Sequence, residues 1–573
     1  MNGAARIVRV SGPLVEVACA GAAVAMHDLV GLGPHNIPGE VMAISDGQLT
    51  VQAYEYTGGL TPGDPAAPHG YPLSVPLGPG LLGGVFDGLL RPLTNAPTWL
   101  GERSYIESGT RRWEFAPTVR AGADVAAGSV LGVVHNAGSI EHRLQVPPGV
   151  AGAVQSVVPP GIYPADAVLA TVGETPVSMS TPWPIRVARP YRDRRDEVVP
   201  LHTGQRVVDL LFPVARGSTA AVPGGFGTGK TVLLQQLTKW CDADVIVYVG
   251  CGERGNEMAE IVTDMLDLAD PRTGGRLADR TVIIANTSNM PMMAREASIY
   301  TGVTVAEYFR DMGYHAVVIA DSTSRWAEAL RELASRMGEL PAEEGYPASL
   351  ASELAAFYER AGFVDTLGGQ SGSVTVIGAV SPPGGDVSEP VTVHTERFVR
   401  CRWALDRDLA YSRHYPAVSW SGSFSRDAEA LAAAHVVAGD IDWAAHRGHV
   451  LGLLNESDRL RALTDLVGVG ALPGSERMTL LGGRLLREAV LQQSAQVPND
   501  AHCSPDKTAA LVDAVLAVID TCGEVVAAGV PAQFVEETDF GPLIRAREDG
   551  GPTDTALAAT RRDEVIDRLH QLR

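Results

Sequence analysis

Eight consecutive residues, GGFGTGKT from Gly224 to Thr231, have the residue types and the spacing of a phosphate-binding loop. They fit the pattern G-x-x-x-x-G-K-[ST], in which glycines turn backbone N–H groups toward phosphate and the following helix adds partial positive charge. Lys230 can reach the β and γ phosphates, and the Thr231 hydroxyl can bind Mg²⁺. A glycine-rich turn with a chance lysine is the alternative, but a β run precedes the loop and a helical pattern follows it. The residues expected to hold the nucleotide here are Gly224, Gly225, Phe226, Gly227, Thr228, Gly229, Lys230, Thr231 and Val232.

Two carboxylates follow apolar strands further along the chain. Asp321 ends the run 316–320 in HAVVIADSTSRW, and Glu253 lies just past the run 245–249 in YVGCGERGNE. A carboxylate at the C-terminal tip of a sheet strand lies where α/β sheets bind ligands, so Asp321 is expected to hold magnesium through water. Glu253 can orient the water that attacks the γ-phosphate, and Arg254 can pair with phosphate or fix Glu253. A strand cap and a surface ion pair in a turn are the respective alternatives.

These motifs require a parallel sheet covered by helices. From about residue 200 to about residue 400, apolar β runs alternate with longer helical stretches, which is typical of βαβ units. The runs are TAAVPG, VIVYVG, TVIIAN, AVVIAD and SVTVIGAV. The pattern predicts a P-loop nucleotide-binding α/β domain of the RecA-like kind over residues 186–427.

The other regions predict a multidomain chain. Residues 1–75 carry the β-rich runs RIVRVSG, LVEVAC, EVMAI and LTVQAYEY, which favour an N-terminal β-barrel. Residues 76–110 are Gly-rich and apolar, more linker than element, and residues 111–185 form a β-rich insertion expected to be structural or to dock a partner. Residues 428–573 are rich in Ala and Leu with helical periodicity and predict a C-terminal α-helical domain.

Composition narrows the function classes. The 573 residues include 46 Lys and Arg against 67 Asp and Glu, a formal net charge of -21, so the chain lacks the basic footprint of a nucleic-acid binder. Its six cysteines form no CxxC pair, which argues against a zinc knuckle or a disulfide framework and fits a reducing compartment. No secretory signal and no apolar run of about 18 residues is visible, so a cytoplasmic protein is expected.

The motifs, in this order and with this N-terminus, closely resemble the catalytic A subunit of vacuolar/archaeal-type rotary ATPases. The resemblance covers most of the chain and includes PLGPGLLGGVFDGLLRPL, GCGERGNEMAE, PAEEGYPASLASELAAFYERAG and SVTVIGAVSPPGGDVSEPVT. Residues 111–185 look like the insertion of the A subunit, which the related catalytic β subunits lack. The intact Lys230, Thr231 and Glu253 distinguish the chain from the non-catalytic B subunits.

The resemblance implies an ATP hydrolase or synthase that binds ATP/ADP and Mg²⁺. Lys230 and Thr231 would hold phosphate and magnesium, and Asp321 would support the magnesium. Glu253 would position the water, and Arg254 would contact the γ-phosphate region. An arginine finger would come in trans from the neighbouring B-type subunit, so the isolated chain should be a poor catalyst.

The resemblance also implies partners and a location. The chain would alternate with B-type subunits in a hexamer around a central rotor shaft, on the cytoplasmic face of a membrane. The C-terminal domain would push on the shaft, the insertion would meet the peripheral stalk, and H⁺ or Na⁺ would move in a separate membrane sector. The sequence leaves the direction of the reaction and the choice of ion open.

Two positions depart from the family pattern. Relatives usually carry an aromatic residue in the stretch that lines the adenine pocket, where this chain has Gln496; Tyr415 matches the other pocket aromatic. Loss of one stacking ring is expected to cost about 1 to 3 kcal/mol of base binding. Thr228 stands where some eukaryotic relatives have a cysteine that can form a regulatory disulfide, so no such switch is expected here.

Two other interpretations remain open at the level of sequence. A degenerate subunit would hold nucleotide without turning it over; Gln496 favours this interpretation slightly, whereas Lys230, Glu253 and Asp321 count against it. A hexameric RNA-translocating or export-type ATPase would use the same core, but it would lack the insertion at 111–185.

Overall fold

The computed structural model describes residues 5–19, 23–45, 47–94, 111–270 and 272–573. The chain divides into two compact units. The first comprises Met1–Asp196, Ala243–Val380 and Ser388–Phe398, and the second comprises Glu197–Asp242, Ser381–Val387 and Val399–Arg573. Each unit contains part of the predicted nucleotide-binding region 186–427, and the domain boundaries drawn from the sequence stay predictions.

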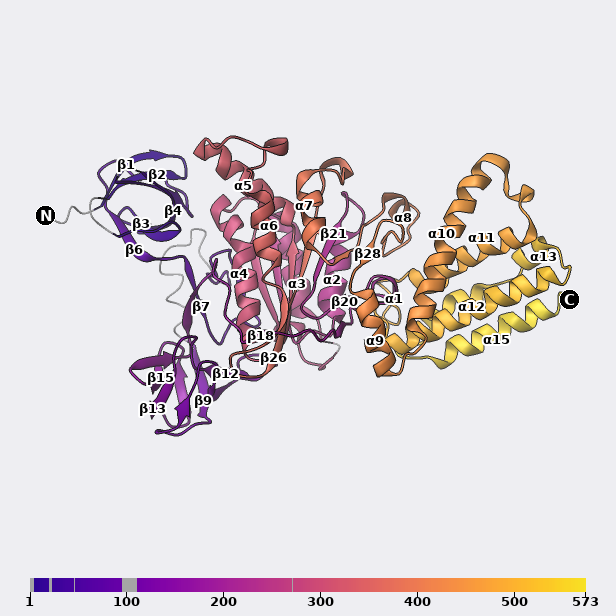
Figure 1. Cartoon of the computed structure of the whole chain (residues 1–573), viewed down its shortest axis with the longest axis horizontal. Coiled ribbons are helices and arrows are strands. Elements are labelled where there is room, and N and C mark those ends of the chain that lie inside the picture. Colours follow the sequence, from indigo (N-terminus) through magenta and orange to yellow (C-terminus); the bar gives the residue numbers. More distant parts are fainter. Residues whose placement is uncertain (1–4, 20–22, 46, 95–110, 271) are drawn as a thin grey trace. The chain divides into compact units, whose positions relative to one another are not determined.

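The N-terminal part of the first unit is a β-barrel, as expected (Figure 1). Its antiparallel strands, in spatial order, are β1 (Arg6–Ser11), β2 (Leu14–Ala18), β5 (Gln48–Ala53), β4 (Ile37–Ser45), β3 (Asp28–Leu32) and β6 (Ala66–Pro72). A bridge between Arg6 and Pro65 joins the two ends of the sheet, and alternating residues such as Val15, Val17 and Val51 fill the core. Sequence analysis missed both β3 and β6. In β6 the strand pattern is weakened by two prolines.

The insertion is a sandwich of two four-stranded sheets, which confirms a β-rich region. One sheet contains β12 (His142–Gln145), β11 (Val130–His135), β9 (Arg112–Pro117) and β14 (Gly161–Pro164). The other contains β10 (Asp124–Val125), β13 (Gly152–Val157), β15 (Val168–Val172) and β16 (Thr175–Ser178). Trp113, Phe115, Leu131 and Leu169 belong to one shared core.

Residues 76–94, expected to be more linker than element, are instead largely packed into the fold. β7 (Ser74–Leu77) pairs with β17 (Thr181–Pro184), and β8 (Val85–Phe86) joins the parallel sheet. Gly88 approaches the backbone so closely that a Cβ there would lie 1.9 Å from the carbonyl oxygen of Ala294. Glycine at this position therefore serves close packing rather than flexibility. Residues 95–110 lie outside the described part of the chain.

The rest of the first unit is a parallel sheet covered by helices. Its parallel strands, in spatial order, are β26 (Ser371–Val380), β24 (His315–Asp321), β22 (Val245–Cys251), β23 (Thr281–Asn286) and β8. β25 (Gly362–Asp365) runs antiparallel to both β26 and β18 (Asp193–Arg194). The helices are α3 (Gly255–Asp267), α4 (Met292–Asp311), α5 (Thr323–Met337), α6 (Leu350–Tyr358) and α7 (Pro390–Phe398). Four of the five apolar runs predicted as strands lie here and are confirmed.

The second unit contains the fifth predicted strand, β21 (Thr219–Pro223), which pairs in parallel with β27 (Cys401–Arg402). β28 (Phe424–Ser425) pairs with β27, and β19 (Pro200–Leu201) pairs with β20 (Val214–Ala215). The unit also contains α2 (Lys230–Trp240) and the short helices α1 (Arg206–Leu211) and α8 (Arg407–Tyr411).

The C-terminal region is helical, as expected (Figure 1). Its elements are α9 (Ala428–Ala438), α10 (Trp443–Val467), α11 (Gly474–Leu486), a π-helical turn (Arg487–Leu491), α12 (Pro505–Ala527), α13 (Ala532–Glu536), α14 (Gly541–Asp549) and α15 (Ala556–His570). α11 and α15 pack on α12 and bury residues spaced three or four apart, among them Leu511 and Val515.

The described residues contain neither a membrane-spanning helix nor a disulfide bond. None of the helices there combines the length and the apolar character that a membrane crossing requires. No disulfide joins any of the six cysteines, all of which lie in the described part of the chain.

A buried ion cluster ties the barrel to α4 within the first unit. Arg186 donates two hydrogen bonds to Glu40, at 2.8 and 3.1 Å, and two to Glu296, at 3.0 and 2.7 Å. Glu40 also accepts from Tyr54 at 2.5 Å and lies 2.8 Å from His27. Burial alone would raise the pKa of Glu40, but the charge of Arg186 and these hydrogen bonds outweigh it and lower the pKa to about 2.

We expect Arg186→Met to lower the free energy of unfolding at pH 7 by about 3–5 kcal/mol, because two buried carboxylates would lose their cation. In the wild type, the contribution of Glu40 is complete above its unfolded pKa of 4.5 and is lost as the pH falls toward 2. In the variant, protonation removes a buried unpaired charge. The stability gap between the two proteins should therefore narrow from pH 7 to pH 3 in urea unfolding.

The matched control is Arg9→Met, which removes the exposed ion pair between Arg9 and Glu16. That change should alter stability by less than about 1 kcal/mol. A gap between wild type and Arg186→Met that stays constant with pH would contradict the assigned role of the cluster.

Candidate functional site

The predicted phosphate-binding loop connects β21 to α2 in the second unit. Gly227 and Gly229 have φ angles of 79° and 84°, in the left-handed region that favours glycine. Gly229 is also the residue before α2, and neither a side-chain cap nor an acidic residue occupies the first turn of that 11-residue helix. The N–H groups at the start of α2 therefore remain available to an anion, as the sequence pattern requires.

The side chains of the loop are arranged around its own backbone. The ammonium of Lys230 donates to the carbonyl oxygen of Gly224 at 3.3 Å and to the hydroxyl of Ser381. The hydroxyl of Thr228 donates to the carbonyl oxygen of Gly225 at 2.8 Å, which closes the turn. Thr231 is an exposed residue in the first turn of α2.

A cavity of about 760 Å³ lies beside this loop within the second unit. It brings together Tyr415, Gln496 and Val232 with the loop residues Gly227 and Gly229, all of them singled out from the sequence. A Cβ on Gly229 would lie 3.1 Å from the ring of Tyr415, so the aromatic ring rests directly against the loop. Sequence reasoning missed other lining residues, among them Arg413, Gln492, Gln493, Arg547 and Glu548.

A fully buried carboxylate supports the wall of this cavity. Asp500 accepts hydrogen bonds from Arg206 at 2.7 Å, from Arg547 at 2.9 Å and from the backbone N–H of Ser494 at 2.7 Å. Both guanidinium groups also donate to the carbonyl oxygen of Gln492, at 2.6 and 2.9 Å. The ion cluster therefore fixes the segment that carries Gln496.

Gln493 links the two walls of the cavity. Its backbone N–H donates to the carbonyl oxygen of Tyr415 at 2.7 Å, and its side chain accepts from the N–H of Arg206 at 2.9 Å. Its amide nitrogen donates to the carbonyl oxygen of Gly204 at 2.9 Å. No local pattern could have identified these partners, because Gln493 lies 287 residues from Arg206 in the chain.

The two predicted carboxylates lie at one edge of the parallel sheet in the first unit. β22 and β24 pair in parallel with Gly250 opposite Asp321, so Asp321 and the residues after β22 share the carboxyl end of the sheet. Asp321 is buried and accepts from the hydroxyl of Tyr248 at 3.1 Å; burial, with the charge of Asp321, raises the pKa of Tyr248. The carbonyl oxygen of Glu253 accepts from the N–H of Ser288 at 2.9 Å.

Arg254 forms an exposed ion pair, which is the alternative that the sequence left open. It directly precedes α3, its side chain is 73% exposed, and it pairs with Glu257 at 3.7 Å. An exposed ion pair of this kind contributes no more than about 1 kcal/mol, so Arg254 can turn to another anion at little cost. Two residues before Arg254, Gly252 has a φ of 76°, and a Cβ there would lie 2.8 Å from Cβ of Arg325. Only glycine fits at that position of the loop.

Four family models match the chain. The nucleotide-binding domain of the ATP synthase alpha/beta family matches residues 204–425, and the beta-barrel domain of that family matches residues 7–70. The barrel-sandwich domain of the ATP synthase alpha/beta subunits matches residues 108–186. The C-terminal domain of V and A type ATP synthase matches residues 438–526.

Known proteins are similar over nearly the whole chain. The A-type ATP synthase A subunit of Haloferax volcanii is 47% identical over 547 residues, covering 94% of this chain and 93% of that protein. The V-type ATP synthase alpha chain of Nitrosococcus oceani is 48% identical over 560 residues, covering 95% of this chain and 93% of that protein. Among solved structures, the ATPase EscN of the enteropathogenic E. coli type III secretion system has a TM-score of 0.64, with 90% of this chain and 100% of that chain covered. At 21% identity, this likeness shows the fold alone.

We expect Asp500→Asn to raise the Kd for Mg-ATP and to lower the free energy of unfolding by about 3–5 kcal/mol, because the buried Arg206 would lose its counter-charge and Arg547 would keep only Glu548. Nucleotide titration and urea unfolding measure the two effects. Asp513→Asn is the control: it weakens a pair with His446 whose carboxylate is 57% exposed, and should change stability by less than about 1 kcal/mol. Equal effects of the two substitutions would contradict a role for Asp500 in the cavity wall.

We expect Gln496→Phe to strengthen ATP binding by about 1–3 kcal/mol and Tyr415→Ala to weaken it by a similar amount, because each change adds or removes a ring beside the base. The affinity for inorganic tripolyphosphate, which has no base, should stay constant in both variants. A parallel change in tripolyphosphate affinity would show that the substitutions act on the phosphate loop instead.

Proposed function

The chain belongs to the ATP synthase alpha/beta family, and from this premise we propose that it is the catalytic subunit of a rotary ion-translocating ATPase or ATP synthase. The family's nucleotide-binding domain accounts for binding of ATP or ADP. The observation that carries the proposal is the pairing of an intact phosphate loop with a cavity that places Tyr415 against it. In the proposed enzyme, Glu253 would position the attacking water and Asp321 would support the magnesium ion.

The donor groups fit Mg²⁺. No cluster of three His, Cys, Asp or Glu side chains that could hold a metal unaided occurs among the described residues. Magnesium is commonly held by one or two protein oxygens together with substrate phosphates and water. The hydroxyl of Thr231, an exposed residue, and the carboxylate of the buried Asp321 are hard oxygen donors of that kind. When bound, the ion would neutralise charge on the phosphates.

The proposed mechanism consists of positioning and electrostatic stabilisation. Lys230 and the N–H groups at the start of α2 hold the phosphate chain, and Arg254 adds positive charge at the γ-phosphate. Glu253 orients the attacking water and accepts its proton. Burial raises the pKa of Cys251 to about 12, so this neighbouring thiol stays neutral and adds no negative charge beside Glu253.

The proposed partners follow from family membership. The chain would alternate with B-type subunits in a hexamer, with an arginine finger supplied in trans by the neighbour. The helices of residues 428–573 would act on a central shaft, and the sandwich of residues 111–185 would meet a peripheral stalk. H⁺ or Na⁺ would cross the membrane in a separate sector of the complex. This chain would lie at the cytoplasmic face of that membrane and would bind no nucleic acid.

We expect Mg-ATP hydrolysis to be low for the chain alone and to rise by a factor of about 10³ to 10⁵ on assembly with a B-type partner and shaft subunits, because the partner supplies the arginine. Glu253→Gln should abolish turnover in the complex while leaving ATP binding intact. Phosphate release measures turnover, and nucleotide titration measures binding.

The control is Glu257→Gln, which removes the exposed carboxylate paired with Arg254 and should retain turnover. A wild-type complex that assembles and binds ATP but never hydrolyses it would identify a nucleotide-binding regulatory protein instead.

A further inference from the structure

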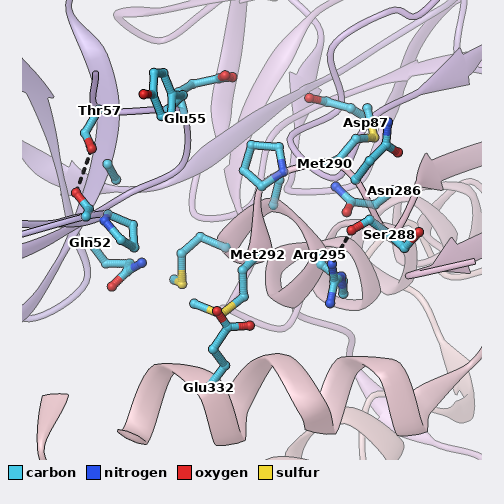
Figure 2. A pocket seen from close by; sticks show the side chains of 18 of the residues that line it. Gln52, Glu55, Thr57, Asp87, Asn286, Ser288, Met290, Met292, Arg295 and Glu332 are labelled. Carbon is cyan, nitrogen blue, oxygen red and sulfur yellow. Dashed lines mark hydrogen bonds between the residues drawn. The ribbon is translucent and has the colours of Figure 1, made fainter. Parts of the chain in front are cut away.

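A second cavity, of about 740 Å³, lies within the first unit between the barrel and the segment that connects β23 to α4 (Figure 2). Barrel residues such as Gln52 and Thr57 form one side, and Asn286, Ser288 and Arg295 belong to the other. None of its lining residues belongs to the predicted nucleotide site, so the cavity needs an explanation of its own.

The N-terminus of a long helix opens into this cavity. α4 has 20 residues and begins at Met292, and its first residues, Met292 to Arg295, line the wall. The preceding residue, Pro291, offers no side-chain cap, and the first turn contains no acidic residue. Because the first N–H groups of a helix have no intrahelical acceptor, this wall presents donors and partial positive charge.

Two side chains on the same wall carry buried polar atoms that have no hydrogen-bond partner among the described residues. Asn286 is fully buried, and neither its amide nitrogen nor its amide oxygen has a hydrogen-bond partner among the described residues. Arg295 donates from one terminal nitrogen to the carbonyl oxygen of Ser288 at 3.1 Å, but its Nε is buried without a partner in the described part of the chain. Such unsatisfied groups are rare in folded proteins and destabilise them unless something else binds there.

The remaining charged groups on the wall engage one another. Arg91 pairs with Asp87 at 2.6 Å and with Glu55, and burial raises the pKa of Glu55, which favours its neutral form. Arg336 pairs with Glu332 at 2.5 Å at the exposed rim. Among the described residues, Arg295 is the charged group of this cavity that has no carboxylate within ion-pair distance.

We propose that the α4 end of this cavity binds a small oxyanion, a phosphate or a carboxylate, through the N–H groups of Met292–Ala294, the guanidinium of Arg295 and the amide of Asn286. Backbone N–H groups at a helix start together with an arginine are a recurrent environment for such anions. The methionines nearby, Met290 and Met292, are flexible enough to move aside as the ligand enters.

The same segment holds the loop that carries Glu253. The N–H of Gly252 donates to the carbonyl oxygen of Asn286 at 2.7 Å, and the N–H of Ser288 donates to the carbonyl oxygen of Glu253 at 2.9 Å. An anion bound at Asn286 and Arg295 therefore stiffens the backbone behind the proposed catalytic carboxylate and alters turnover. This regulatory consequence rests on the proposed function, whereas binding of the anion does not.

Equilibrium dialysis of the full chain with radiolabelled inorganic phosphate tests the site. Lys230→Ala is the background, because it removes phosphate bound at the loop that precedes α2. We expect this variant to retain bound phosphate. Adding Arg295→Gln removes a charge-assisted hydrogen bond and adding Asn286→Leu removes an amide hydrogen bond, so each should weaken phosphate binding by at least about tenfold. Competition by acetate and citrate, compared with sulfate, distinguishes a carboxylate site from a phosphate site.

Asn286→Leu separates binding from folding. Because the amide has no partner in the described structure, an apolar residue of similar size should keep or raise the melting temperature. Asn289→Ala, an exposed position on the same wall, is the control and should retain phosphate.

The proposal fails if Lys230→Ala binds neither phosphate nor carboxylate, if binding survives both substitutions, or if Asn286→Leu lowers the melting temperature. If the chain binds phosphate at this site but never hydrolyses ATP in the complex, the anion site is supported and the proposed function is wrong.

Discussion

The pairing of buried guanidinium groups with carboxylates is the constraint on which this structure depends. Asp500, with no exposed surface, binds Arg206 and Arg547 at once and so holds the segment that forms one wall of the cavity beside the Gly224–Thr231 loop. Arg186 likewise binds Glu40 and Glu296 and joins the barrel to α4. Removing charges from water is costly unless each has a partner, so these pairs permit few alternative arrangements of the segments that they connect.

Two helix starts illustrate how the same backbone property can be used differently. At α2, a glycine-rich loop exposes the unfilled N–H groups and supplies Lys230 beside them. At α4, Pro291 precedes the helix and the groups face a cavity with Asn286 and Arg295. Donors alone do not define a function; the neighbouring side chains decide which anion is bound and what happens to it.

The sequence predicted the longer parallel strands β21, β22, β23, β24 and β26 because each contains a largely apolar run of residues. β22 and β24 are almost entirely buried on both faces, and that leaves an unmistakable pattern. It failed for β6, whose prolines hide an edge strand, and for residues 76–94, whose glycines allow close packing rather than a flexible connection. Composition alone does not distinguish those two uses of glycine.

The sequence by itself located the loop from Gly224 to Thr231, because a phosphate-binding pattern consists of adjacent residues in a short, fixed order. The carboxylates Glu253 and Asp321 could also be located, since each directly follows its own strand. Only the tertiary structure decided which residues support the cavity beside that loop and which form the second cavity. Arg206 and Asp500 are 294 residues apart in the chain. Gln52 comes from the barrel and Asn286 from the parallel sheet of the first unit. Contacts between such distant segments arise from packing, and no local pattern of residue types records them.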